Sequence, residues 1–350
     1  MAKKIIILCS LLYTVYSDSS LPYFPGVTDM GIILANSGLP NSQACPGNCD
    51  IYGARDTFVW YDPTDNEYPY KMTYDGSGPT AWLASLAVSN DPTLKTWIKK
   101  GTLLSLGSPG EVDSASASYL TTFYDNEYTH SWIGYYLGTN QSSPPPGRVP
   151  VGPYYTMLAT APTASGPYTK YEHLNNVIPS GSPGVVMKNP NNSSEYWQFC
   201  TGCAGGSVGL VKTTNLTTPW TNVEALIHDP VENTSLYYEA FNQLWFLFTN
   251  HIGPDSTGVN FDDSIWVYWS NNLTYWPPNQ KAVVLNRTNV IEPTFQTGRV
   301  GLPSILAIPG NTEKLAMIYD GGGDRNNVWY NQNCSIALAW LNLPLIPPAV

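Results

Sequence analysis

The chain has 350 residues and a formal net charge of −10 at pH 7, with 16 Lys and Arg against 26 Asp and Glu. So few cations exclude a nucleic-acid partner, whose backbone needs clustered Lys and Arg, and give no attraction to anionic membranes. We therefore expect a neutral substrate and no membrane partner. The content of Tyr (24), Trp (12), Gly (29) and Pro (30) is typical of an all-β protein with many turns.

The first 17 residues have the pattern of a secretory signal peptide. Lys3 and Lys4 form a short positive region, and residues 5–12 form an apolar stretch. This stretch is far shorter than the roughly 20 residues that a membrane span needs. We predict cleavage after Ser17 and a secreted, extracellular, monomeric protein in which residues 18–350 form a single domain.

Sequons and cysteines agree with a secretory route. Eight N-glycosylation sequons favour a glycoprotein, and they start at Asn140, Asn191, Asn192, Asn215, Asn233, Asn272, Asn286 and Asn333. Cys45 and Cys49 are close enough to close a small loop. Cys200 and Cys203 are better interpreted as a structural disulfide than as half of a zinc site, because no second CxxC or His pair stands at suitable spacing. Cys334 has no assigned partner.

One pattern recurs five times along the chain and sets the predicted fold. An aromatic strand is followed by a small or apolar strand, a short turn with Trp, Tyr or Pro, and another short strand. The aromatic strands are residues 70–74, 132–136, 196–199, 245–248 and 315–319, and the segments that follow are 87–104, 158–178, 210–227, 268–285 and 337–348. Five such repeats predict a five-bladed β-propeller, whose sheet edges are short and protected. A β-sandwich would not repeat this segment five times.

Acids at the starts of the innermost strands are the candidate catalytic residues. In a propeller these strand starts converge on a central channel from distant parts of the chain. Sugar hydrolysis needs two carboxyl groups on opposite sides of the scissile bond, one protonated and one ionised. Asp56 precedes the apolar strand of the first repeat. We place Glu232 at the corresponding position of the fourth repeat, where Glu239 is the competing acid.

A third candidate acid, Asp113, precedes a run of small residues in the second repeat, as expected where strands crowd a narrow channel. Three further residues are candidates for substrate binding. Arg55 is one, although it could instead pair with its neighbour Asp56. His251 follows the aromatic strand of the fourth repeat, and Arg299 opens the fifth.

Segments of the first and fourth repeats carry a family resemblance. They are A-R-D-T-F-V-W-Y-D in the first repeat, and E-N-T-S-L-Y-Y-E-A-F-N-Q-L-W-F-L-F-T-N with D-S-I-W-V-Y-W-S-N-N-L-T-Y-W in the fourth. These segments are similar to the first and the acid-bearing blades of family 43 and family 32 glycoside hydrolases, with family 43 favoured. S-G-P-Y-T-K and T-T-P-W-T-N resemble their recurrent G-P-W turns. At the level of blade pattern, the resemblance covers most of the chain after residue 17.

The resemblance implies a hydrolase for arabinose-, xylose- or related sugar linkages in polysaccharides or oligosaccharides. Asp56 would be the base that activates water, and Glu232 the general acid, with inversion at carbon. The third carboxylate of family 43 belongs to the third repeat, where residues 182–186 hold no acid, and Asp113 is the candidate substitute.

Other family features are missing from the chain. The fifth repeat lacks the metal-associated His of related enzymes, so we expect no metal and no cofactor. The signatures of family 32 are missing too. The alternative is therefore a non-catalytic carbohydrate-binding propeller that kept the fold and lost the third carboxylate.

Overall fold

The computed structural model describes residues 21–141, 152–175, 177–179, 181–252, 263–323 and 333–349. Their regular structure is almost entirely strand, apart from a one-turn helix, α1 (Pro293–Thr297), and a 3-10 turn, η2 (Pro46–Asn48). Within these ranges no helix has the length and apolar character of a membrane span. The predicted signal peptide, residues 1–17, lies outside the described residues.

The strands form five antiparallel four-stranded units, which we number in chain order. Unit 1 has β2 (Gly53–Tyr61), β3 (Tyr70–Ser77), β4 (Trp82–Ser89) and β5 (Ile98–Thr102); unit 2 has β6 (Ser116–Asp125), β7 (Ser131–Thr139), β8 (Tyr155–Ala161) and β9 (Thr169–Asn175). Unit 3 has β10 (Ser182–Asn189), β11 (Asn192–Thr201), β12 (Val208–Thr213) and β13 (Thr221–Ile227); unit 4 has β14 (Val231–Glu239), β15 (Leu244–His251), β16 (Ser264–Ser270) and β17 (Lys281–Leu285). Unit 5 has β18 (Arg299–Leu306), β19 (Lys314–Gly322), β20 (Cys334–Asn342) and β1 (Val27–Leu34). Units 1 and 2 share one eight-stranded sheet, in which a single parallel residue pair, Leu83 with Ala117, joins them.

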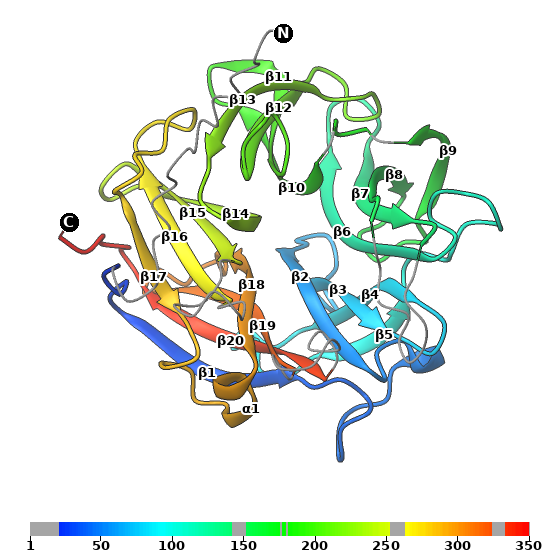
Figure 1. Cartoon of the computed structure of the whole chain (residues 1–350), viewed down its shortest axis with the longest axis horizontal. Coiled ribbons are helices and arrows are strands. Elements are labelled where there is room, and N and C mark those ends of the chain that lie inside the picture. The colour runs from blue at the N-terminus through cyan, green and yellow to red at the C-terminus, as the bar shows by residue number, and fades with distance from the viewer. Residues whose placement is uncertain are drawn as a thin grey trace, which may run out of the picture.

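The units lie around a common axis, with β2, β6, β10, β14 and β18 innermost (Figure 1). Each innermost strand contacts the next, and β18 contacts β2, so the ring closes. The first strand of the chain, β1, pairs with β20 and completes unit 5. The sequence pattern predicted instead a second short strand within residues 337–348. That prediction was wrong, because β20 ends at Asn342 and β1 occupies the outer position of the unit.

The core lies between neighbouring units, and the five predicted aromatic strands are the second strands of their units, β3, β7, β11, β15 and β19. Both faces of such a strand pack against protein, so it has a nearly continuous buried run rather than an alternating one. In β3 every residue is buried, and in β19 every residue after Lys314 is buried. Between units 4 and 5, Phe246, Phe248 and Tyr319 belong to one apolar cluster.

Each innermost strand has a β-bulge near its start, at a register shift against the second strand of the same unit. We call the first residue inside each shift the bulge residue. The five bulge residues are Asp56, Tyr119, Pro183, Asn233 and Leu302. All except the proline have a left-handed backbone, with φ between 51° and 56°. The bulges re-aim side chains at the start of the inner strands, where the candidate site lies.

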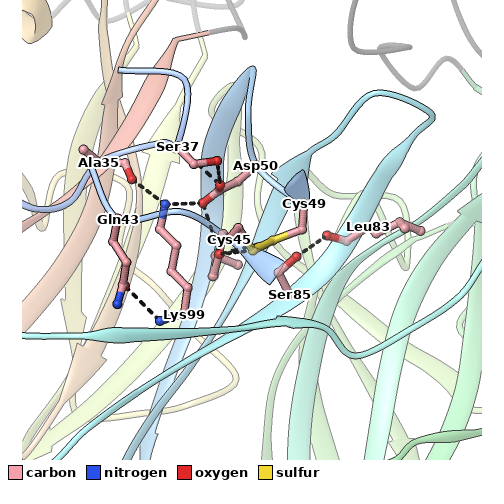
Figure 2. The surroundings of a disulfide bond; sticks show 10 residues. Ala35, Ser37, Gln43, Cys45, Cys49, Asp50, Leu83, Ser85 and Lys99 are labelled. Atoms are coloured by element: carbon pink, nitrogen blue, oxygen red, sulfur yellow. Dashed lines mark hydrogen bonds and ion pairs between the residues drawn. A yellow bond between two sulfur atoms is a disulfide. The ribbon is translucent and has the colours of Figure 1, made fainter. Parts of the chain in front are cut away.

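Both predicted disulfides are present, Cys45–Cys49 and Cys200–Cys203, and Cys334 is a buried thiol outside them. Figure 2 shows the first one beside a buried ion pair between Lys99 Nζ and Asp50 Oδ2, 2.6 Å apart. In the described part of the chain, Cys45, Cys49 and Asp50 are the one group with clustered metal-ligating atoms. The sulfur atoms of the two cysteines are bonded to each other and so cannot act as thiolate ligands.

Candidate active site

Asp56, the bulge residue of β2, is held from three units of the ring. Its Oδ2 lies 2.6 Å from Nε of Arg55, and its Oδ1 accepts a hydrogen bond of 3.1 Å from Nδ2 of Asn233 in unit 4. Its backbone N–H donates to Oδ2 of Asp320 in unit 5, at 3.0 Å. The side chain keeps 13% of its surface exposed. Asp56 is therefore a well-oriented carboxylate that solvent can still reach.

Glu232 lies on β14, and its Oε1 accepts a hydrogen bond of 3.1 Å from Nδ2 of Asn250. Burial raises the pKa of this carboxyl, and the charge of Asp56 raises it further. The guanidinium groups of Arg55 and Arg299 act in the opposite direction. Because Asn233, the residue after Glu232, donates to Asp56, the two acids share one interior although 176 positions separate them in the sequence. The competing acid, Glu239, instead accepts backbone N–H groups from Phe241 and Leu345.

The register corrects one detail of the sequence analysis. Glu232 pairs with Asn250 as Arg55 pairs with Asp75, each just before its bulge. The structural counterpart of Asp56 is therefore Asn233, with φ of 51° against 52°. The expectation that Glu232 corresponds to Asp56 was wrong by one residue.

The two arginines predicted to bind substrate lie at this centre and are ion-paired with carboxylates. Nε of Arg299 lies 3.1 Å from Oδ2 of Asp263, and its Nη2 lies 3.8 Å from Oδ1 of Asp320. Nε of Arg55 lies 3.9 Å from Oδ2 of Asp320 as well as beside Asp56. Since the side chain of Arg299 is only 3% exposed, its first role in this structure is to compensate buried carboxylates.

Two acids that the sequence analysis missed, Asp75 and Asp320, are buried near Asp56. Burial raises the pKa of Asp320 to about 6, while Arg299 and Arg55 oppose the increase. Burial, and then the charge of Asp56, raise the pKa of Asp75 well above its usual value. Both acids stand in a Tyr-Asp-Gly sequence, residues 74–76 and 319–321, at the ends of the first and fifth aromatic strands. That repeat was a usable sequence signal.

Asp113 lies elsewhere, in the connection between β5 and β6. Its Oδ2 is ion-paired with Nζ of Lys170 and accepts a hydrogen bond of 2.9 Å from the Tyr136 hydroxyl. Together with Glu111 and Tyr171 these residues line a pocket of about 160 Å³. The structure thus places Asp113 with Lys170, and the carboxyl groups beside Asp56 come from Asp75 and Asp320.

His251, the remaining predicted substrate-binding residue, ends β15 and is 2% exposed. Its ring stacks on that of Trp266, with centroids 3.9 Å apart and planes 4° apart. This packing places the imidazole inside unit 4, against the third strand of the same unit.

Comparison with known proteins gives a fold but no family. No protein-family model matches the chain, and no curated protein matches its sequence. Among solved structures, the catalytic domain of a GH62 α-L-arabinofuranosidase from Coprinopsis cinerea has a TM-score of 0.59 at 12% identity, over 94% of this chain and 100% of that one. An exo-1,5-α-L-arabinanase from a bovine ruminal metagenomic library has a TM-score of 0.54 at 14% identity, over 82% and 92%.

An exo-β-1,3-galactanase from Phanerochaete chrysosporium has a TM-score of 0.57 at 12% identity, over 93% of this chain and 66% of that one. At these identities the likeness shows the fold alone. The chain is an all-β protein that resembles propeller-fold glycoside hydrolases in structure.

Proposed function

We propose that the protein is a secreted glycoside hydrolase built on a five-bladed β-propeller. The blade count follows if units 1 and 2 are two blades, because only the pair Leu83–Ala117 joins them into one sheet. Every other sheet in the described residues has four strands, with β10, β14 or β18 innermost. Pairing of β1 with β20 then closes the last blade.

The observation that carries the proposal is the shared interior of Asp56 and Glu232. Glycoside hydrolysis needs one carboxyl group that keeps its proton and one that is ionised. The raised pKa of Glu232 suits the general acid, which protonates the leaving oxygen. Asp56 accepts from Asn233 and pairs with Arg55, and these contacts orient its two oxygens for the role of the base. Asp56 then takes a proton from the attacking water.

The substrate we propose is a neutral oligosaccharide or polysaccharide with arabinose-, xylose- or related linkages. The neighbours named for arabinose and galactose support a carbohydrate substrate. The resemblance to family 43 supports attack by water with inversion, and a net charge of −10 suits a neutral ligand better than an anionic one.

A screen of aryl-glycosides with the wild type and two isosteric variants, Asp56→Asn and Glu232→Gln, tests this function. We expect the wild type to cleave at least one pentoside, and both variants to lose at least about 100-fold in kcat, the scale of general acid–base catalysis. Asp113→Asn is the matched control, because its carboxyl pairs with Lys170. Proton NMR of the first product anomer tests inversion. Wild-type activity in either variant at positions 56 or 232 refutes that assignment.

One observation favours a second candidate, a carbohydrate-binding propeller without catalysis. The bulge residue of β10 is Pro183, so the third unit offers no carboxylate at this position. A binding protein would retain oligosaccharides on an affinity gel and leave every aryl-glycoside in the screen intact. Hydrolysis by the wild type, with no hydrolysis by Asp56→Asn or Glu232→Gln, excludes a binding protein without catalysis.

Secretion, glycosylation and a monomeric state belong to the same proposal. We expect glycans at the exposed Asn191, Asn215 and Asn272. We expect none at Asn233, whose amide donates to Asp56, or at Asn286, which is 7% exposed. Mass spectrometry of protein secreted by eukaryotic cells would show site occupancy, and light scattering would show the oligomeric state.

A further inference from the structure

One position recurs in the second strand of every unit, opposite the residue that precedes the bulge. We call it the acceptor position. Register pairing identifies its occupants as Asp75, Leu137, Thr201, Asn250 and Asp320. These residues hold equivalent register positions in their units, so their side chains can be compared directly.

Three acceptor positions bind the bulge residue of another unit. The N–H of Asp56 donates to Asp320, and the N–H of Tyr119 donates to Oδ1 of Asp75. The N–H of Asn233 donates to Oγ1 of Thr201 at 2.8 Å. A bulge removes a backbone N–H from the strand ladder, and a buried N–H without an acceptor is costly. Each contact therefore satisfies a bulge and joins it to the preceding unit.

Of the remaining two acceptor positions, one matches the bulge residue of the next unit and one does not. Leu137 offers no acceptor, and the bulge residue that follows in the next unit is Pro183, which has no N–H to satisfy. In unit 4, the Oδ1 atom of Asn250 lies against Gly301, directly before the bulge residue Leu302, and accepts no hydrogen bond. The acceptor side chain and the next bulge residue are thus matched at four of the five junctions of the ring.

A charge is not needed for this hydrogen bond, because neutral Thr201 makes it for Asn233. Asp320 is nevertheless an aspartate with no exposed surface, and it serves the bulge residue proposed as the catalytic base. The groups that face it are Arg55 and Asp56 from β2, Arg299 from β18 and Cys334 from β20. Its carboxylate therefore lies between two guanidinium groups and the backbone of Asp56.

We propose that Asp320 is a positioning residue for Asp56, which it orients through the backbone N–H and by holding Arg55, the ion-pair partner of Asp56. This inference rests on the proposed function in so far as it concerns catalysis. The orientation of the Asp56 backbone is a structural claim that can be measured without a substrate.

Two substitutions separate the hydrogen bond from the charge. Asp320→Asn keeps an acceptor oxygen but loses the charge, whereas Asp320→Leu loses both. Ser304→Ala is the matched control, because Ser304 Oγ accepts the N–H of Val59 at 2.9 Å and joins β18 to β2 away from Asp56. The readouts are the pH profile of kcat/KM and hydrogen exchange at the Asp56 amide.

For Asp320→Asn we expect wild-type protection of the Asp56 amide and the loss of any change in kcat/KM near pH 6, where Asp320 itself titrates, because an amide cannot ionise. For Asp320→Leu we expect faster exchange at Asp56 and a loss of about 100-fold in kcat, the scale of a small misplacement. Ser304→Ala should lower the melting temperature while its kcat, pH profile and Asp56 exchange stay as in the wild type.

An unchanged pH profile in Asp320→Asn overturns the role of the Asp320 charge in holding Arg55, and unchanged Asp56 exchange in a folded Asp320→Leu overturns the positioning role. If the wild type cleaves no glycoside, the proposed function fails. Amide exchange in the same variants still decides whether Asp320 positions Asp56.

Discussion

Gly301 is the position where a single methyl group should disturb the candidate site most directly. A Cβ atom there would lie 2.0 Å from Oδ1 of Asn250 and 3.3 Å from Nη2 of Arg299. Asn250 has no exposed surface, and its amide donates to Glu232 at 3.1 Å. The Gly301→Ala substitution therefore forces Asn250 away from its place beside the proposed acid.

The size of the effect follows from two contributions. Overpacking a buried position costs about 1–3 kcal/mol, and loss of a hydrogen bond to a neutral carboxyl group costs about 0.5–1.5 kcal/mol. We expect Gly301→Ala to lower the free energy of unfolding by about 1.5–4.5 kcal/mol. In an Asn250→Ala background the clash is absent, so the same change should cost at least about 1 kcal/mol less.

Urea denaturation of the wild type, the two single variants and the double variant measures this coupling, and the kcat of Gly301→Ala on the best glycoside measures its catalytic effect. We expect kcat to fall because Glu232 loses its oriented donor. Wild-type stability of Gly301→Ala, or additive effects in the four-protein cycle, would refute the packing argument.

Three further changes test other parts of the structure. Asp113→Asn should lower the free energy of unfolding by about 1–3 kcal/mol by weakening the Lys170 pair, with kcat unchanged; a large loss of kcat would return Asp113 to the catalytic site. Asp320 binds its proton more tightly when folded, with a pKa near 6 against 3.8, so its contribution to stability is full below about pH 4 and is lost as pH rises through 6. Urea denaturation from pH 4 to 7 should show a decline of up to about 3 kcal/mol from this group that Asp320→Asn lacks, and parallel curves would contradict it. The paired change Cys45→Ser and Cys49→Ser should cost about 2 kcal/mol, the entropy of a small closed loop, and an unchanged urea midpoint would argue against that disulfide's contribution.

The second strands could be predicted because burial on both faces restricts which residue types a strand can contain. Second strands buried on both faces need aromatic and β-branched residues, and the five predicted aromatic runs coincide with them. The outer strand of unit 5 could not be predicted this way. It comes from β1, at the other end of the chain, and only long-range pairing with β20 reveals it.

In the candidate site, too, some features could be predicted from local sequence and others required the long-range pairing of strands. Asp56 and Glu232 stand at strand starts, a position visible in the sequence, and the structure brings them into one interior. A bulge adds one residue without altering composition, so the equivalence of Asp56 with Asn233 needed the register. Asp113 precedes small residues as a channel acid would. Its partner Lys170 lies 57 positions away in the sequence, and no local pattern shows that pairing.

The proposed mechanism depends most on Glu232 as the proton donor and Asp56 as the base at one glycosidic bond. The most direct test compares leaving groups, with kcat/KM measured for Glu232→Gln and Asp56→Asn on a dinitrophenyl glycoside and on the matching alkyl glycoside. An activated leaving group needs no acid, so Glu232→Gln should keep near wild-type activity on the first substrate and lose at least about 100-fold on the second. Asp56→Asn should lose activity on both. Equal losses of Glu232→Gln on the two substrates would contradict the assignment of the acid, and with it the proposed mechanism.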